Sequence, residues 1–596
     1  MPRFSIPRFL DDFTGRISRL FGSGQLMLSV LAMGIGVITG GGVIVFRETI
    51  NFMQTTFFGG SEGSLFEQAA LLPWWQIILV PTLGGAVIGI ASKYLMPDGR
   101  PQGVADVIEA SALRGGHLSG LVALKAAVIN AASIGFGASV GREGPAVHFG
   151  AALGSWLAQA LGQTRSVSRT LLGCGAAAAV AASFNAPIAG ALFASEVVIG
   201  HYALSAFAPI VIASVSATAV SRYYFGDYPA FLIPEHTIQS LWEYPAFIGL
   251  GIVAGFTAMA FMKGIMTANN LSQKIPAPDW LKPVMGGLMI GIIAVWFPHI
   301  LGVGYGTTES AVMVAFPLGM LVAILLAKIA ATAISVGFGF GGGVFSPSLV
   351  IGAMLGGAYG TLFTQLFPAL STGTGAYSIL GMGAVTAAVL GAPISTALII
   401  FEMTGDYALT LALMVAVVIA SLITREFHGG SFFSWQLERR GHDLRDGFEM
   451  ALLRNIAVKS ILSTAGERVT LGVGLPEIRK MLQKSEVGEL FVIDAGGALF
   501  GTITLADLSD FAFDPVLDHL LTASDVARRH PPVLVSDDNL ETALSVMRES
   551  GEFCIGVVKT GNTPTFLGSV RQGRVMDVYN RTLVESQREE RGWRND

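Results

Sequence analysis

Two adjacent ionisable residues, Arg142 and Glu143, lie inside a glycine-rich stretch, GFGASVGREGPAVHFGAALG, between long apolar segments. A charged side chain at the centre of a bilayer costs roughly 2.5 to 3.5 kcal/mol on insertion scales. Such residues therefore usually face a protein-lined or water-filled route and mark a pathway for ions or protons. This pair is the first candidate for the chemistry of the chain.

The composition indicates an integral membrane protein. Of the 596 residues, 52% are apolar and 13% are charged, and the mean hydropathy is +0.60, which is too apolar for a soluble protein of this size. Within 316–424 the only ionisable acids and bases are Lys328, Glu402 and Asp406, whereas 426–596 has the composition of a soluble domain. We therefore expect a membrane part first and a soluble part second.

Several apolar runs have the roughly 20 residues that span a bilayer. They begin near Leu26, Trp75, Phe247 and Leu318. Shorter runs are interrupted or bounded by Gly, Pro and Asn, at Leu121 to Ala132, Ala176 to Ala182 and Ala186 to Val198. For these we expect re-entrant or broken helices, which are tolerated at membrane depth only where they are buried in protein or line a cavity. This pattern is typical of a transporter or channel rather than of a simple anchor.

Basic residues at both ends of the membrane part predict cytoplasmic termini by the positive-inside rule. They are Arg3, Arg8, Arg16 and Arg19 before the first apolar run, and Arg425, Arg439, Arg440 and Arg445 after the last. The first run is too long for a secretory signal and lacks a clear cleavage site. The two cysteines, Cys174 and Cys554, lie in different regions, so neither a disulfide framework nor a cysteine metal site is expected.

The membrane part contains an internal repeat. Two copies align without gaps: Gly-Phe-Gly at 135–137 with 337–339, Pro145 with Pro347, and 150–154 with 352–356. In this register Phe345 stands opposite Glu143. A second pair follows in the same order, Phe-Asn-Ala-Pro at 184–187 and Leu-Gly-Ala-Pro at 390–393, with Glu196 and Glu402 nine positions after each proline. Two matches in order imply a duplicated membrane unit, an arrangement that places a substrate site between the repeats near the midplane.

The glycine-rich segments could bind a small anion. Glycine lets the backbone approach a ligand, and Pro145 and Pro347 fit the first turn of a helix. Helix N-termini present unpaired N–H groups and the positive end of a dipole, so two converging starts would hold an anion without a buried cation. The alternative is that these small residues only permit tight helix packing. A dinucleotide fingerprint at 337–342 is excluded, because no strand precedes it and no acidic residue follows about 20 positions later.

Glu143 has two interpretations. It could be neutralised by Arg142 in a structural ion pair, or its carboxylate could compete with the permeating anion and leave when protonated. Glu196 and Glu402 are structural, capping or cavity-lining candidates. His148 is expected to be structural, because it has no partner at ligand spacing.

The chain resembles the CLC family of chloride channels and chloride/proton exchangers. The resemblance covers about Leu26 to Arg440 and is carried by GREGP at 141–145, GGGVFSP at 341–347 and the Ala-Pro helix starts before the two glutamates. It implies an all-α polytopic membrane domain with an inverted repeat, and a homodimer with one anion pathway per subunit. It further implies that Glu143 is the external gating glutamate. Residues implied near the anion are Arg142, Gly144, Val344 and Phe345, the last two through their backbone amides.

Three positions depart from the family pattern. Gln102, in PQGVA, stands where the family often has the serine of GSGIP, and an amide donor could replace that hydroxyl. Phe433 aligns with an expected tyrosine and keeps its bulk without the hydroxyl. Val197 follows Glu196 where many exchangers carry a second glutamate. Because valine cannot relay a proton, passive chloride conduction is favoured. Chloride/proton exchange stays open as the alternative, since water could bypass this position, with Glu143 and Glu196 as proton-pathway candidates.

The soluble part carries a second, weaker repeat that resembles a pair of CBS domains, an α+β unit often found at this family's cytoplasmic end. CBS pairs often bind adenine nucleotides through a threonine or serine with an aspartate three residues later. Thr504 and Asp507 fit that spacing, but the second copy reads Ser-Val-Arg-Gln at 569–572 without the aspartate. A structural or dimer-stabilising role is therefore the alternative to nucleotide binding.

The expected domains are a cytoplasmic N-terminal segment 1–24, a transmembrane domain 25–430, a linker 431–455, two CBS domains 456–514 and 515–580, and a polar tail 581–596. We expect chloride, other small anions and the lipid bilayer as partners, no nucleic acid, no cofactor beyond a possible nucleotide, and residence in a bacterial inner membrane. No enzymatic activity is expected: an intramembrane metalloprotease would need HExxH, which does not occur. A cation transporter would need acidic clusters that the membrane part lacks.

Overall fold

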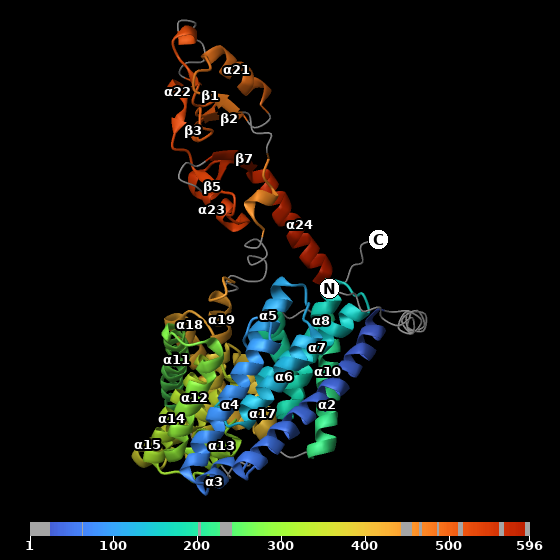
Figure 1. Cartoon of the computed structure of the whole chain (residues 1–596), viewed down its shortest axis with the longest axis vertical. Helices are drawn as coiled ribbons and strands as arrows, with labels where there is room; N and C mark the ends of the chain where they lie inside the picture. Colours follow the sequence, from blue (N-terminus) through green and yellow to red (C-terminus); the bar gives the residue numbers. More distant parts are fainter. Residues whose placement is uncertain are drawn as a thin grey trace. The chain divides into compact units, whose positions relative to one another are not determined.

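The computed structural model describes residues 24–61, 63–200, 204–226, 241–442, 456–463, 468–485, 488–509, 517–559 and 565–590. The chain divides into two compact units, Met1–Arg445 and Asp446–Asp596 (Figure 1). The basic N-terminal segment predicted at 1–24 lies outside the described residues except for its last residue. Most of the predicted linker, including Arg445, and the end of the predicted tail also lie outside them.

The first unit is built of helices. Its α-helices are α2 (Gly24–Phe58), α3 (Leu65–Ala70), α4 (Trp74–Leu95), α5 (Val104–Leu113), α6 (Gly120–Gly135), α7 (Glu143–Ala160), α8 (Arg165–Phe184), α9 (Pro187–Phe193), α10 (Leu204–Phe225), α11 (Tyr244–Lys274), α12 (Lys282–Trp296), α13 (Tyr305–Val312), α14 (Leu318–Gly337), α15 (Phe345–Leu366), α16 (Thr374–Leu390), α17 (Pro393–Thr404), α18 (Tyr407–His428) and α19 (Phe432–Glu438). A π-helical turn follows α9 at Ala194–Ile199, and 3-10 turns lie at Leu241–Glu243, Asp279–Leu281 and Pro298–Ile300.

Nine helices within the described residues are long and apolar enough to cross a membrane. The four apolar runs predicted to span the bilayer lie in four of these helices, which begin at Gln25, Trp74, Tyr244 and Leu318. Of the two alternatives expected at 176–182, re-entrant or broken, the broken helix is wrong, because α8 continues unbroken for 20 residues until Asn185 adopts a left-handed conformation. Its small residues serve burial instead: 83% of this span is buried inside the protein. Within 186–198 the helix is short but not broken, since the seven residues of α9 continue directly into the π-helical turn and form one helix, Pro187–Ile199.

The repeat is visible in reciprocal helix contacts. A Cβ added to Gly85 of α4 would lie 2.2 Å from the carbonyl oxygen of Pro283 on α12, and one added to Gly287 of α12 would lie 2.1 Å from that of Pro81 on α4. Each residue of one contact stands 202 positions from its counterpart in the other. Only glycine permits so close an approach of two helix backbones. The two contacts are therefore related by a pseudo-two-fold axis.

The second unit combines short strands and helices. They are β1 (Arg468–Thr470), α21 (Leu475–Lys484), β2 (Glu489–Ile493), β3 (Leu499–Thr504), α22 (Ala523–Val526), β4 (Arg528–Arg529), β5 (Val533–Val535), α23 (Leu540–Ser550), β6 (Cys554–Lys559), β7 (Thr565–Arg571) and α24 (Gln572–Glu590), with 3-10 turns at Val458–Ser460 and Leu517–His519. The sheets have the orders β1-β2-β3-β4 and β5-β6-β7.

The same short motif is built twice in this unit. β1 pairs parallel with β2 across α21, and β2 pairs antiparallel with β3, with Leu490 opposite Ile503. β5 pairs parallel with β6 across α23, and β6 pairs antiparallel with β7, with Ile555 opposite Val570. These four side chains are buried. The weak repeat seen in the sequence thus corresponds to two β-α-β-β motifs.

Candidate anion site

The two glycine-rich loops of the repeat meet at one point. The N–H of Gly141 donates to the carbonyl oxygen of Gly343 at 2.7 Å, and the N–H of Gly343 donates back to Gly141 at 2.8 Å, in an isolated antiparallel bridge. α7 begins two residues after Gly141 and α15 begins two residues after Gly343. The predicted convergence of two helix starts is confirmed. Pro145 and Pro347 are the third residue of each helix, as predicted.

Buried serines fix these loops from the neighbouring helices. Ser133 Oγ on α6 accepts a hydrogen bond from the N–H of Gly341 at 3.0 Å, and Ser335 Oγ on α14 accepts one from the N–H of Ser139 at 3.1 Å. The two bonds are repeat counterparts, because Ser335 and Gly341 stand 202 positions from Ser133 and Ser139. Neither serine was predicted from the sequence. The signal available was the serine two residues before Gly135 and Gly337 in both copies.

Glu143 is the first residue of α7, and its side chain is 1% exposed. Tyr305, at the start of α13, donates its hydroxyl to Oε1 at 2.9 Å, and the Ser346 hydroxyl on α15 donates to Oε2. A Cβ added to Gly141 would lie 3.0 Å from both Glu143 Oε2 and the Ser346 backbone nitrogen. The carboxylate therefore lies at the N-terminal end of α15, where unpaired amides attract an anion. Neither Tyr305 nor Ser346 was predicted, since each reaches Glu143 from a distant part of the chain.

Arg142 has a looser relation to Glu143. Its Nε lies 3.6 Å from Oε1, while its guanidinium carbon lies 4.8 Å from the centre of the Tyr305 ring. Both side chains of the pair are buried, at 8% and 1% exposure. Arg142 thus adds positive charge beside the carboxylate, but the close hydrogen bonds to Glu143 come from the two hydroxyl groups.

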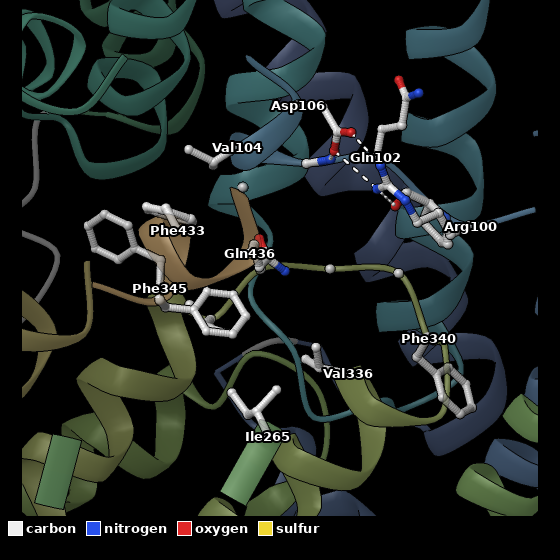
Figure 2. Close-up of a pocket in the computed structure, with 18 of the residues that line it drawn as sticks. Arg100, Gln102, Val104, Asp106, Ile265, Val336, Phe340, Phe345, Phe433 and Gln436 are labelled. Carbon is white, nitrogen blue, oxygen red and sulfur yellow. Dashed lines mark hydrogen bonds and ion pairs between the residues drawn. The ribbon is translucent and has the colours of Figure 1, made fainter. Parts of the chain in front are cut away.

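A cavity of about 390 Å³ extends from Glu143. Six of the predicted site residues line it, namely Gln102, Glu143, Gly144, Val344, Phe345 and Phe433. Arg142 is not among the described residues that line it. Figure 2 shows Phe433 of α19 near Phe345 of α15, with Gln436 close by. The cavity therefore joins the start of α15 to the start of α19.

Gln102 and Phe433 contribute differently to this cavity. The backbone oxygen of Gln102 accepts a hydrogen bond from Asn130 Nδ2 at 3.3 Å, and Figure 2 shows the Gln102 amide turned away from Phe345 and Phe433. This placement does not provide the amide donor expected at the site. Phe433 is 7% exposed and lines the wall as an apolar ring.

Charged residues surround one end of the cavity. Asp106 of α5 accepts from Arg100 at 2.8 Å and from Arg440 at 3.1 Å, and Arg440 also binds Glu109 at 3.0 Å. Arg439 instead donates to two uncharged side chains, Asn269 at 2.9 Å and Gln273 at 3.0 Å. These amide oxygens do not neutralise its charge. Since Arg439 lines the cavity, this end favours anions.

Glu196 and Glu402 lie at helix starts of the opposite repeat. Glu196 accepts hydrogen bonds from the N–H groups of Ile394 and Ser395 in α17, at 3.1 and 2.8 Å. Glu402 accepts from the N–H groups of Ile188 and Ala189 in α9, at 3.0 and 2.7 Å. The capping role among the predicted alternatives fits both residues. Val197, next to Glu196, packs half-buried against the hydrophobic core.

The remaining candidates carry no visible chemistry. His148 is 1% exposed, and within the described residues its Nε2 has no hydrogen-bond partner. In the second unit, Asp507 accepts two hydrogen bonds from Thr504, one from its N–H and one from its hydroxyl, both at 2.8 Å. No group of His, Cys, Asp and Glu within the described residues is arranged to hold a metal ion.

The family model described as voltage gated chloride channel matches residues 84–425, the region that contains both glycine-rich loops and most of the residues that line the cavity. The chain belongs to this family, the CLC family. Two curated CLC relatives agree. A putative chloride channel protein ClcB-like from Ralstonia nicotianae is 34% identical over 421 residues, 70% of this chain and 98% of the relative. The voltage-gated ClC-type chloride channel ClcB of Escherichia coli is 32% identical over 414 residues, 68% and 97% of the two chains.

Solved CLC structures share the fold. A slow cyanobacterial Cl–/H+ antiporter is 26% identical, with a TM-score of 0.62 over 69% of this chain and 97% of the other. A eukaryotic CLC transporter, at 19% identity, has a TM-score of 0.61 over 92% of this chain and 98% of the other. The chain is therefore an integral membrane protein of the CLC type that transports anions.

Proposed function

We propose that the chain conducts chloride and other small anions passively, with the Glu143 carboxylate as the gate. The observation that carries the proposal is the position of this carboxylate at the N-terminal end of α15, between Tyr305 and Ser346. While ionised, it occupies the place that the helix dipole offers to an anion. Once protonated, it loses the charge that favours this place, and an anion replaces it.

The proposed anion ligands lie around the same cavity. The backbone amides of Val344 and Phe345, at the start of α15, would hold the anion. Gly144 lets the loop approach closely, because a Cβ there would lie 3.2 Å from the Gly343 Cα. Arg142 would add positive charge nearby without binding the anion directly. Phe433 would narrow the route with an apolar ring, and Gln102 would shape it through its backbone.

Two features support passive conduction. Val197 cannot carry a proton. Both carboxylate oxygens of the adjacent Glu196 are engaged by amides of α17. In a planar bilayer with a fixed chloride gradient, the reversal potential should therefore stay at the chloride equilibrium potential when opposed pH gradients are imposed. A shift towards the proton equilibrium potential would contradict passive conduction.

Chloride/proton exchange is the second candidate, favoured by the 26% identity to a structure named a Cl–/H+ antiporter. Glu143 and Glu196 would then be the proton-pathway residues, with water passing Val197. Paired measurements of chloride and proton flux in vesicles separate the two modes. Proton uptake driven by chloride efflux alone would establish exchange, and chloride efflux without proton movement would establish conduction.

We propose that the chain is a homodimer with one anion pathway per subunit. α17 packs against both α9 and α18, and the three helices present exposed apolar side chains, namely Ile188, Ile394, Leu411, Met414, Val418 and Leu422. A second copy would cover this surface. Light scattering in detergent should give twice the 62.5 kDa mass of the chain. A mass of one chain would contradict the proposal.

For the second unit we propose a CBS pair, supported by its two β-α-β-β motifs. The Asp507 carboxylate is already engaged by Thr504, which disfavours its use as a nucleotide ligand. The proposed role of the pair is therefore to stabilise the dimer. Adenine nucleotide binding at Thr504 and Asp507 is the alternative. Calorimetric titration of the full-length protein with ATP separates them: heat of binding that Asp507→Ala abolishes would favour the nucleotide site.

We further propose that the protein resides in a bacterial inner membrane with both termini in the cytoplasm, has no enzymatic activity, and needs no resident cofactor for transport. The cationic Arg439 and Arg440 after α18 support this orientation under the positive-inside rule. Protease digestion of inside-out and right-side-out vesicles tests it, since only inside-out vesicles should lose the second unit.

A further inference from the structure

Tyr305 holds the gating carboxylate from a separate part of the chain, 162 positions away from Glu143. Its hydroxyl donates to Oε1 at 2.9 Å, while Ser346 donates to Oε2. The two hydroxyl groups come from different helices, α13 and α15. Each carboxylate oxygen therefore has its own donor, which fixes the orientation of the carboxylate plane.

The segment before Tyr305 is itself held in place. Lys328 of α14 is fully buried and donates its Nζ to the carbonyl oxygens of Ile300 and Gly302, both at 3.0 Å. Gly304, directly before Tyr305, has a φ of 93°, a conformation that favours glycine. A Cβ at Gly304 would also lie 2.8 Å from a side-chain carbon of α15. The tyrosine therefore reaches Glu143 from a fixed loop.

Arg142 fixes the ring of the same tyrosine. Its guanidinium carbon lies 4.8 Å from the ring centre, a distance at which cation and ring attract. A bond from a neutral donor to an ionised carboxylate is roughly twice as strong as one to a neutral carboxyl group. The tyrosine hydroxyl thus favours the ionised, seated form of Glu143 over the protonated form.

The charged and titratable groups around this carboxylate come from several helices. Arg142 directly precedes α7 and Tyr305 lies on α13, while α15 contributes the uncharged Ser346. Lys328 of α14 lies one step further out, against the loop before Tyr305. On α5, Asp106 shares the cavity with Glu143 and is paired with Arg100 and Arg440.

We propose that Tyr305 is a positioning residue that latches the ionised Glu143 carboxylate in the blocking position. This role of Tyr305 rests on the proposed gating function, because Tyr305 acts only through Glu143. Removal of the hydroxyl should weaken the closed form and leave the anion ligands of α15 untouched. The latch therefore sets the pH range over which the pathway opens.

The test compares chloride efflux from vesicles at equal inner and outer pH for the wild type, Tyr305→Phe, Glu143→Gln and the double variant. Loss of a hydrogen bond to a charged group should change the ratio of open to closed forms by about tenfold or more. Tyr305→Phe should therefore raise efflux at alkaline pH and move the midpoint of the efflux curve about one pH unit upward. Tyr359→Phe is the matched control, since its hydroxyl donates to the Ala246 carbonyl oxygen at 2.9 Å, away from Glu143.

The double variant separates the latch from a general structural effect. Tyr305→Phe should change nothing further once Glu143 is glutamine, and Tyr359→Phe should leave the curve of the wild type in place. An unchanged curve for Tyr305→Phe, or an equal effect of Tyr305→Phe with and without Glu143, would overturn the latch alone. If Glu143→Gln itself keeps the pH dependence of the wild type, the gating function fails and the latch with it.

Discussion

Glu196 and Glu402 cap each other's repeat. The Glu196 carboxylate binds the first-turn amides of α17, the helix that carries Glu402, and the Glu402 carboxylate binds the first-turn amides of α9, the helix that leads to Glu196. A carboxylate at a helix N-terminus is stabilised by the helix dipole and by the unpaired N–H groups. The two glutamates therefore hold the halves of the membrane unit together.

Glu196→Ala and Glu402→Ala should each destabilise the protein by about 1 kcal/mol, because each removes the side-chain acceptor of two first-turn amides. Thermal unfolding in detergent measures this, and Glu426→Ala, at an exposed position of α18, is the control. Loss of proton movement in Glu196→Ala with unchanged stability would show that Glu196 relays protons instead.

The repeat made the main site predictable from the sequence. The register of Glu143 against Phe345 and the proline spacing depend only on neighbouring residues, so the two helix starts could be placed without a structure. Tyr305 could not be placed, since its contact with Glu143 depends on how α13 packs against α7. A tyrosine between two glycines at 304–306 carries no local signal for such a contact.

The wrong prediction for 176–182 has a different physical cause. Glycine and alanine near Asn185 suggested a break, but in a buried helix the same small residues allow close backbone packing. Gly175 shows this directly, because a Cβ there would lie 1.8 Å from the carbonyl oxygen of Gly150 on α7. Composition alone does not distinguish a broken helix from a tightly packed one.

Ser133→Ala should alter anion selectivity as well as stability. It removes the acceptor of the Gly341 N–H, whose loop lines the cavity, at a cost of about 1 kcal/mol. Ser335→Ala is the matched control, because it breaks the equivalent bond to Ser139. We expect similar stability loss in both and a changed chloride-to-nitrate permeability ratio only in Ser133→Ala. Equal ratios in the two variants would refute a role of this loop in selectivity.

Glu489 should make the second unit sensitive to pH. Burial, followed by repulsion from Glu552, raises its pKa to about 7, above the value of about 4.3 in an unfolded chain. The contribution of protonated Glu489 to the free energy of unfolding is full below the unfolded pKa. It is lost as the pH rises through about 7, where the buried carboxyl group ionises. Glu489→Gln should therefore stabilise β2 and β3 by about 2 kcal/mol at about pH 8 and much less at about pH 5, allowing for partial screening by water.

Hydrogen exchange of the full-length protein measures this difference in peptides that cover β2 and β3, with wild type and variant compared at the same pH. Glu477→Gln, at an exposed position of α21, is the control. Equal protection of Glu489→Gln and wild type at about pH 8 would refute the predicted destabilisation by the ionised carboxylate.

The most direct test of the gate is chloride efflux from vesicles that contain Glu143→Gln, measured at equal inner and outer pH from about 4.5 to about 8, a range that brackets carboxylate titration. Glutamine mimics the protonated side chain, and Glu309→Gln, at an exposed position of α13, is the control. Efflux through the wild type should fall as the pH rises, while Glu143→Gln should keep the high efflux of acidic pH throughout. A Glu143→Gln variant with the pH dependence of the wild type would contradict the gate.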